Sequence, residues 1–266
     1  MEIHPSAIVG RNAKLGPGVK IGPFSIIGNH VTIGRDTIVG PHVVIDGNTG
    51  IGERNNIYPF VSIGSPPQDI SYKGEDTRVV IGDDNIIKEY VTINRASTKQ
   101  EWVTAVGNKN YMMAYAHVGH DCVLGNNIIM SNAATLGGHT VVGNYATLGG
   151  LMASHQFVRI GAYAFISGLT GLPQDIPPYM LAAGPRARLY GLNLVGLRRH
   201  GFSRAVIDGL RKAYRIIWHE SGRFDEGISR VRKEIEPFPE LDVLLDFFRE
   251  SKRGVTRKAS GNIAEI

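Results

Sequence analysis

The feature that most constrains this chain is an aliphatic residue at every sixth position. From Val9 to Ile63, ten consecutive positions spaced by six are aliphatic. A second run from Val106 to Leu172 is apolar at eleven of twelve positions, with Ser154 as the exception, and a short run between them covers residues 81–93. Six matches neither the 3.6-residue period of an α-helix nor the two-residue period of a half-buried strand. The period therefore indicates a repeat architecture.

A six-residue repeat is typical of a parallel β-helix whose coils form a triangular prism. Each unit makes one side, so three units, or 18 residues, complete a coil, with the aliphatic residue pointing inward. The glycine that often follows it, as at 21–22 and 33–34, is interpreted as turning the corner, where a side chain would be strained. Successive coils then pair at a spacing of ~4.8 Å. The sequence predicts a mainly β fold built as a parallel β-helix over residues 1–183.

Two segments interrupt the repeat, at residues 65–78 and 94–105, and the second shifts its phase by one. We expect both to be loops that leave the prism, where solenoid proteins often carry binding residues. The alternative for each loop is a tolerated insertion without function.

The hexapeptides stop after residues 177–178, and residues 184–266 are predicted to form a small α-helical C-terminal domain. Apolar residues recur at helical spacing in 201–218, where Ser203 is a plausible N-cap. Residues 224–235 and 239–251 read as further helices separated by prolines, and 191–200 as another. Residues 252–266 resemble a mobile tail.

Composition and charge exclude several classes of protein. The chain has one cysteine, which excludes an internal disulfide framework and agrees with a cytoplasmic location. It has no recognisable signal peptide and no apolar run near the ~20 residues of a membrane span. Residues 1–183 carry 12 Lys+Arg and 13 Asp+Glu, whereas residues 184–266 carry 17 and 11. A basic helical part suggests an acidic partner, but no nucleic-acid-binding motif is present, and an ordinary solvated face stays the alternative.

The stretch AHVGHDC at 116–122 concentrates polar chemistry inside the repeat. Residues 18 apart stack on adjacent coils, so Asp121 lies over His139, and His120 over Gly138 and then Gln156. These five residues are predicted to form one polar wall, within ~10 Å along the prism. His117 lies on the neighbouring edge.

A histidine beside a carboxylate suits general base catalysis. The imidazole of His120 can accept a proton from a hydroxyl, and Asp121 can hold the ring in the required tautomer. A glycine such as Gly138 lets its backbone N–H approach an oxyanion closely. Cys122 falls at a position where small residues pack, and we interpret it as structural. The pattern favours direct acyl transfer to a hydroxyl without a covalent enzyme intermediate.

The sequence resembles the UDP-N-acetylglucosamine O-acyltransferases that begin lipid A synthesis. The resemblance covers essentially the whole chain and is carried by IGPFSIIG, SIGSPPQD, AHVGHDC, HQF, QDIPPY and GLRRHGFSR. It implies a left-handed coil, a homotrimer with sites between neighbouring prisms, and no metal or cofactor. It also implies transfer of an (R)-3-hydroxyacyl chain from acyl carrier protein, which is acidic, to the 3-hydroxyl of UDP-N-acetylglucosamine.

The resemblance also assigns roles to residues. His120 matches the general base, Asp121 its supporting residue and Gly138 the oxyanion donor. Gly168 matches the end of the acyl pocket, where a missing side chain implies room for a long chain. The remaining matches are to nucleotide-sugar, acyl or phosphopantetheine contacts: Asp69, His117, His139, Gln156, Asn193 and Arg199.

Four positions depart from the family pattern. Ser71 stands where a lysine near the sugar phosphate is usual, Gly119 replaces an alanine, Val195 an acidic residue and His200 a basic one. These departures leave the choice between a 3-hydroxyl and a 3-amino acceptor open. A γ-carbonic-anhydrase-like zinc enzyme, a non-catalytic sugar-nucleotide scaffold and the N-acyltransferase of the same pathway also stay open, although that N-acyltransferase normally carries an extra N-terminal domain.

Overall fold

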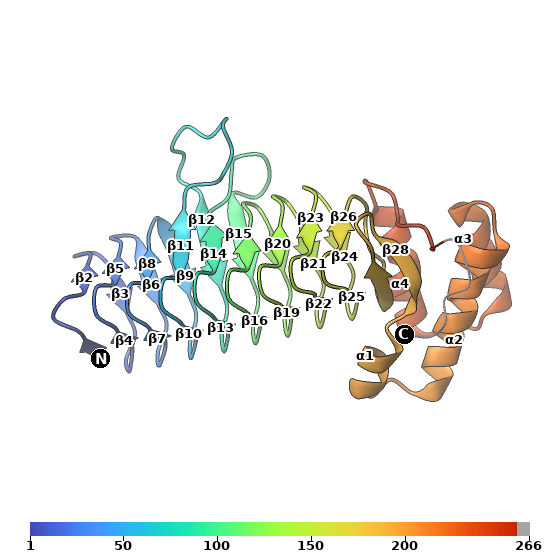
Figure 1. The fold of residues 1–266 in the computed structure, drawn as a ribbon, viewed down its shortest axis with the longest axis horizontal. Helices are drawn as coiled ribbons and strands as arrows, with labels where there is room; N and C mark the ends of the chain where they lie inside the picture. The colour runs from blue at the N-terminus through green and yellow to red at the C-terminus, as the bar shows by residue number, and fades with distance from the viewer. Residues whose placement is uncertain (260–266) are drawn as a thin grey trace.

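The computed structural model describes residues 1–259. Strands from successive coils stack into three parallel sheets that form the faces of a long prism, and helices cover its C-terminal end (Figure 1). We call the faces sheets A, B and C, and the edges between them AB, BC and CA. The parallel β-helix and the helical C-terminal part predicted from the repeats are confirmed.

Sheet A contains β1 (Glu2–Ile3), β4 (Lys20–Ile21), β7 (Ile38–Val39), β10 (Asn56–Ile57), β13 (Ile86–Ile87), β16 (Tyr111–Met112), β19 (Ile129–Met130), β22 (Thr147–Leu148), β25 (Phe165–Ile166), β27 (Met180–Ala183) and β28 (Arg188–Leu192). Sheet B contains β2 (Ile8–Val9), β5 (Ile26–Ile27), β8 (Val44–Ile45), β11 (Ser62–Ser65), β14 (Thr92–Asn94), β17 (His117–Val118), β20 (Thr135–Leu136), β23 (Ala153–Ser154) and β26 (Gly171–Leu172). Sheet C contains β3 (Lys14–Leu15), β6 (Val31–Ile33), β9 (Asn48–Ile51), β12 (Arg78–Ile81), β15 (Val103–Val106), β18 (Val123–Leu124), β21 (Val141–Val142) and β24 (Arg159–Ile160).

The register between strands explains both interruptions of the repeat. Most coils advance by 18 residues, as in the pairing of Glu2 with Lys20. The pairing of β10 with β13 advances by 30 residues and that of β13 with β16 by 25, because residues 65–78 and 94–105 project from the prism as loops (Figure 1). The first loop adds two whole hexapeptide units, whereas the second adds one unit and one residue. The extra residue is the phase shift seen in the sequence.

The inward aliphatic residues fill the prism axis. Ile33, Ile63 and Leu136 are no more than 1% exposed. Ser154, the one polar residue of the second run, is also buried, but its Oγ accepts a hydrogen bond of 3.1 Å from the Gly137 backbone N–H. A buried hydroxyl with a partner avoids most of the cost of desolvation, so the repeat tolerates it.

The glycines do not turn the corners, and this part of the interpretation was wrong. Corner residues in the left-handed region are mostly not glycine; Phe60 and Tyr90 have φ of 63° and 59°. Their exposed rings stack with centroids 5.0 Å apart, which offsets part of the cost of ~1–2 kcal/mol for that conformation. Glycine is needed one position after the inward residue. A Cβ built on Gly34 would lie 2.6 Å from the carbonyl oxygen of Gly52 in the next coil.

The C-terminal part contains α1 (Leu194–Arg199), α2 (Arg204–Arg215), a π-helical turn η1 (Ile216–Glu220), α3 (Phe224–Glu234) and α4 (Pro239–Glu250). Ser203 caps α2 as predicted, because its Oγ accepts a hydrogen bond from the Val206 N–H. The boundary predicted after residue 183 falls at the end of β27, and β28 continues sheet A beyond it by antiparallel pairing. Within residues 1–259, no helix combines the length and apolarity needed to cross a membrane.

The predicted mobile tail is wrong for residues 252–259. This segment returns to the last coil, where Asp175 and Val255 form a parallel bridge. Val255 and Thr256 are buried, and the Thr256 carbonyl accepts a hydrogen bond of 3.1 Å from the indole of Trp218. Apolar burial and backbone pairing therefore hold a segment whose composition alone suggested disorder. Residues 260–266 of the expected tail lie outside the described residues.

Candidate active site

The residues of AHVGHDC lie where the chain passes from sheet B to sheet C. His120 and Asp121 lie between β17 and β18, on edge BC. Both long loops also connect strands of sheet B to strands of sheet C, so they leave the prism at this same edge (Figure 1). The coil therefore brings the two histidine-rich turns and both loops to one edge.

His120 and Asp121 form a buried hydrogen-bonded pair. His120 Nδ1 lies 2.8 Å from Asp121 Oδ2, and the two residues are 5% and 3% exposed. The same carboxylate oxygen accepts a hydrogen bond of 2.8 Å from the Ser97 backbone N–H, and the Asp121 N–H donates to Thr104 Oγ1. The second loop thus fixes the carboxylate, which in turn orients the imidazole so that Nε2 faces away from it.

The carboxylate of Asp121 is set up to stay ionised. Burial raises its pKa, but hydrogen bonds from His120 and Ser97 and the nearby ring of His139 more than offset this effect, so that the net pKa is lowered. A charged Asp121 keeps the proton of His120 on Nδ1 and leaves Nε2 free to accept another.

Gly138 lies directly against the His120 ring. A Cβ built on Gly138 would lie 2.5 Å from both Cε1 and Nε2 of His120, so no side chain fits there. The coil is held at this level by the hydrogen bond of 2.9 Å from the His139 N–H to the His120 carbonyl. The predicted stacking of these residues 18 apart is confirmed, and it places backbone beside the Nε2 atom.

His139 lies in the next coil, edge-on to His120 with ring centroids 5.1 Å apart, and stacks on Phe157 at 4.2 Å. Its Nδ1 is 2.7 Å from Gln100 Oε1, so Nδ1 carries the proton. Burial lowers the pKa of His139, which favours the neutral ring, although the Asp121 charge opposes this effect. His139 is therefore a neutral wall of the site.

His117 and Gln156 flank this wall. His117, on β17, has Nδ1 2.7 Å from Thr92 Oγ1, and burial followed by the charge of His120 lowers its pKa. Gln156 follows β23 on edge BC, and its side chain is exposed. Both can contact a ligand lying along the edge.

Loop residues 94–105 supply contacts that the sequence did not predict. Ser97 holds Asp121, Gln100 holds His139, and Lys99 Nζ lies 2.6 Å from Asp69 Oδ2 in the other loop. The break in the hexapeptide phase was the only signal of their importance, because no period determines where an irregular loop places its side chains. Asp69 thus lies at the same edge as the predicted wall.

Three of the predicted site residues lie on other edges of the same chain. Gly168 lies on edge AB, between β25 and β26. Asn193 caps α1 and donates a hydrogen bond of 3.0 Å to the carbonyl of Tyr163, on edge CA. Arg199 is exposed at the end of α1. The prism does not bring these three residues together with His120 within one chain.

Cys122 is fully buried, and burial raises the pKa of its thiol to about 12. A nucleophilic cysteine needs a thiolate and access to substrate. The structural interpretation of Cys122 therefore agrees with its environment.

The donor set at the site fits a base–carboxylate pair better than a metal ion. His120, Asp121 and His139 offer ligand atoms that all lie within 4.8 Å of one another. However, Asp121 Oδ2 already accepts hydrogen bonds from His120 and Ser97, and His139 Nδ1 is bonded to Gln100. A metal ion would have to displace the hydrogen bond that prepares His120 as a base. This geometry gives the zinc alternative little support.

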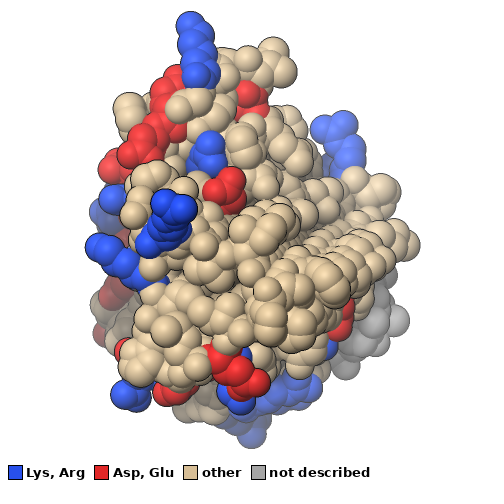
Figure 2. Space-filling model, turned by 90° about the vertical axis from the view of Figure 1, so that its left-hand side faces the viewer, with Lys and Arg blue, Asp and Glu red and all other residues tan. Residues whose placement is uncertain are grey.

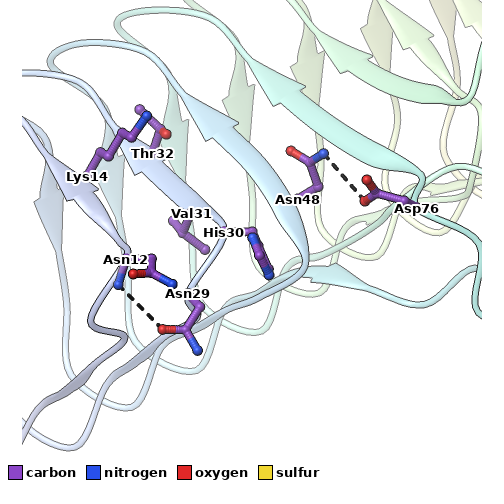
Figure 3. Close-up of a pocket in the computed structure, with 8 residues that line it drawn as sticks. All are labelled: Asn12, Lys14, Asn29, His30, Val31, Thr32, Asn48 and Asp76. Atoms are coloured by element: carbon purple, nitrogen blue, oxygen red, sulfur yellow. Dashed lines mark hydrogen bonds between the residues drawn. The ribbon is translucent and has the colours of Figure 1, made fainter.

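Two open pockets lie away from His120. One, of about 410 Å³, is on the N-terminal coils of sheet C, where Asn48 Nδ2 donates a hydrogen bond of 3.5 Å to Asp76 (Figure 3). Its strand β6 is four strands from β18, or ~19 Å at 4.8 Å per strand. The other, of about 600 Å³, is at the C-terminal end of edge BC and contains Arg186, Arg188 and Arg253. The second pocket therefore offers positive charge on the edge that carries the site.

Comparison with known proteins agrees with this geometry. A family model described as Udp N-acetylglucosamine O-acyltransferase, Domain 2, matches residues 175–256, and one for bacterial transferase hexapeptides (six repeats) matches residues 12–47. The acyl-[acyl-carrier-protein]–UDP-N-acetylglucosamine O-acyltransferases of Syntrophobacter fumaroxidans and Thermodesulfovibrio yellowstonii are 51% and 52% identical to this chain. They cover 97% and 96% of it and 100% and 99% of their own length. The solved structure of LpxA from Acinetobacter baumannii, 38% identical, matches 97% of this chain and 100% of its own with a TM-score of 0.94. The chain belongs to the UDP-N-acetylglucosamine O-acyltransferase family.

Proposed function

We propose that this enzyme transfers an (R)-3-hydroxyacyl chain from acyl carrier protein to the 3-hydroxyl of UDP-N-acetylglucosamine, the first step of lipid A biosynthesis. The relatives that span the whole chain carry this activity in their names. The observation that carries the proposal is the buried His120–Asp121 pair, whose imidazole lies against the backbone of Gly138.

In the proposed reaction, Nε2 of His120 removes the proton of the sugar 3-hydroxyl as its oxygen attacks the thioester carbonyl. The backbone N–H of Gly138 donates a hydrogen bond to the oxyanion of the tetrahedral intermediate. When the intermediate collapses, the C–S bond breaks, and the leaving thiolate takes the proton from His120. Asp121 stabilises the imidazolium between the two transfers. No covalent enzyme intermediate, metal ion or bound cofactor enters any step.

The working unit that we propose is a homotrimer. Gly168, Asn193 and Arg199 lie on edges AB and CA, whereas His120 lies on edge BC, so they can complete the site only from a neighbouring chain. Edge AB also offers an apolar surface for such contacts, and one flank of the prism is largely free of charged side chains (Figure 2). The large apolar residues exposed along edge AB are Phe24, Phe60, Tyr90, Tyr115, Leu151 and Leu169.

The acyl donor approaches, in this proposal, from the C-terminal end of edge BC. Arg186, Arg188 and Arg253 gather there around one pocket, which suits an acidic carrier protein. The segment that carries Arg253 is held in place by the hydrogen bond of 3.1 Å from its Nε to the carbonyl of Pro173. We place the reaction in the cytoplasm, where a free buried cysteine such as Cys122 stays reduced.

Mass spectrometry of the product from purified enzyme, UDP-N-acetylglucosamine and a panel of (R)-3-hydroxyacyl carrier proteins tests the activity. The expected product is an ester that mild alkali cleaves, formed equally well with a metal chelator present. An amide product, formed only with a 3-amino sugar, would support the alternative acceptor. Absence of transfer to either sugar would contradict the proposal.

Mixing two inactive variants tests the shared site. Trimers that combine His120→Ala chains with Arg199→Ala chains should regain part of the activity, because some sites then contain both wild-type residues. No recovery in trimers shown to be mixed would place both residues in the site of one chain.

A further inference from the structure

Lys99 joins the two loops that rise from edge BC. Its Nζ lies 2.6 Å from Asp69 Oδ2, and its side chain is 54% exposed, whereas that of Asp69 is 9% exposed. An ammonium group has three N–H donors, and the bond to Asp69 uses one of them. Lys99 therefore keeps hydrogen-bonding capacity and positive charge directed outward.

The carboxylate of Asp69 serves as an anchor for this lysine. Its Oδ1 accepts hydrogen bonds of 2.9 and 2.7 Å from the backbone N–H and hydroxyl of Ser71, and its Oδ2 accepts from Lys99. These contacts, with that from Lys99 the largest, hold the pKa of Asp69 well below its usual range. A carboxylate bound in this way stays charged and directs the ammonium group.

Lys99 belongs to the segment that also organises the catalytic pair. The next residue, Gln100, bonds His139 at 2.7 Å, and Ser97 donates to Asp121 at 2.8 Å. The charges of Lys99 and Asp69 both act on the His139 ring. The ammonium group therefore lies beside the histidine wall, to which the acceptor sugar must bring its hydroxyl.

We propose that Lys99 is a substrate-positioning residue that binds the diphosphate of the UDP-sugar acceptor, with Asp69 directing it. The inference rests on the proposed function, since it takes the acceptor to be a nucleoside diphosphate sugar. The diphosphate is covalently linked to the sugar that reaches His120, so a cation on the loop that holds Asp121 and His139 fixes charge and reacting hydroxyl together. Ser71, the neighbour of Asp69 in the first loop, offers no charge for this task.

Replacement of Lys99 by methionine keeps the length of the side chain and removes its charge. We expect the KM for UDP-N-acetylglucosamine to rise about tenfold, the size of one partly exposed charge-assisted hydrogen bond. The kcat and the KM for the acyl carrier protein should stay within twofold. Lys73→Met is the matched control, because Lys73 is an exposed lysine of the neighbouring loop without an ion pair to Asp69. An unchanged acceptor KM, or a rise in the carrier KM instead, would overturn the assignment.

Inhibitors locate the contact. Competitive inhibition by UDP should weaken about tenfold in Lys99→Met, whereas inhibition by uridine should not change, because only UDP has the diphosphate. Weakening of both, or of neither, would contradict a phosphate contact. Binding of UDP should also lose part of its salt dependence in the variant.

A rescue separates binding from a structural role. Adding Ser71→Lys to the Lys99→Met variant returns a cation to the same carboxylate from the other loop, and the acceptor KM should fall back toward the wild-type value. If Lys99 only ties the loops together, Lys99→Met should lower the melting temperature and the second lysine should leave KM high. Wild-type enzyme without acyl transfer would reject the proposed function, whereas active wild type with unaffected Lys99→Met would reject this inference alone.

Discussion

The imidazole of His120 lies against the backbone of Gly138, one coil further along the prism, closely enough that a Cβ at 138 would be 2.5 Å from Nε2. The coil length sets this relationship, because residues 18 apart fall at the same place on successive coils. The proposed base and the proposed oxyanion donor are thus positioned by the most regular part of the fold.

A methyl group at position 138 should disrupt the site without disrupting the prism. In Gly138→Ala the His120 ring has to move, and a displacement of ~1 Å at a reacting group costs about a hundredfold in rate. We expect kcat for acyl transfer to fall by at least that factor. Gly150→Ala is the control, since a Cβ there meets its nearest neighbour, the Asn132 carbonyl, at 3.4 Å. Equal activities of the two variants would argue against close contact between His120 and Gly138.

Asp121→Asn should separate orientation from binding. The amide can still accept the Ser97 N–H hydrogen bond, but it cannot stabilise the imidazolium of His120, and kcat should fall roughly 10²–10⁴-fold. The KM for UDP-N-acetylglucosamine should change little, because Asp121 is buried behind the ring. Initial rates at varied acceptor concentration measure both constants. A rise in KM at constant kcat would make Asp121 a binding residue instead.

Acidification should destabilise the fold partly through His139. Burial places the folded-state pKa of this ring below its ordinary value of 6.5, so below about pH 6.5 the unfolded chain binds more protons than the native one. Stability is then lost progressively as pH falls from about 6.5 to the lower folded pKa. His139→Gln should show a smaller drop in melting temperature between about pH 7.5 and about pH 5.5 than wild type. Parallel curves for the two proteins would show that His139 does not contribute.

The length of the acyl pocket should depend on Gly168. Its site on edge AB is exposed, and a Cβ there would lie 3.2 Å from the Gly150 carbonyl oxygen. Gly168→Met adds a side chain that would shorten a pocket at this position, so competition between acyl carrier substrates should favour shorter chains. Unchanged chain preference in a folded, active variant would remove Gly168 from the pocket.

Much of the fold follows from the sequence because one period controls it. The aliphatic phase determines the inward position of every hexapeptide, and the 18-residue coil places His139 and Gly138 beside the AHVGHD turn. The role of glycine is harder to predict, because the sequence does not reveal whether a glycine serves a positive φ or a close approach. Gly34 serves the second, since the next coil passes within contact distance.

The loop contacts could not be predicted in the same way. Ser97, Lys99 and Gln100 act from an irregular segment whose side-chain directions depend on tertiary packing. Residues 252–259 resemble a tail in sequence because their composition is polar and basic. The pairing of Val255 with Asp175 depends on a strand edge that forms only once the prism is complete.

The central claim is that His120 is the general base of acyl transfer. The most direct test is the turnover of purified His120→Ala, measured by mass spectrometry of acylated UDP-N-acetylglucosamine, with the circular dichroism spectrum and oligomeric state checked against wild type. Loss of at least about a hundredfold in kcat from a protein that keeps its assembly and still binds acyl carrier protein is the predicted result. Turnover near the wild-type rate would contradict the mechanism.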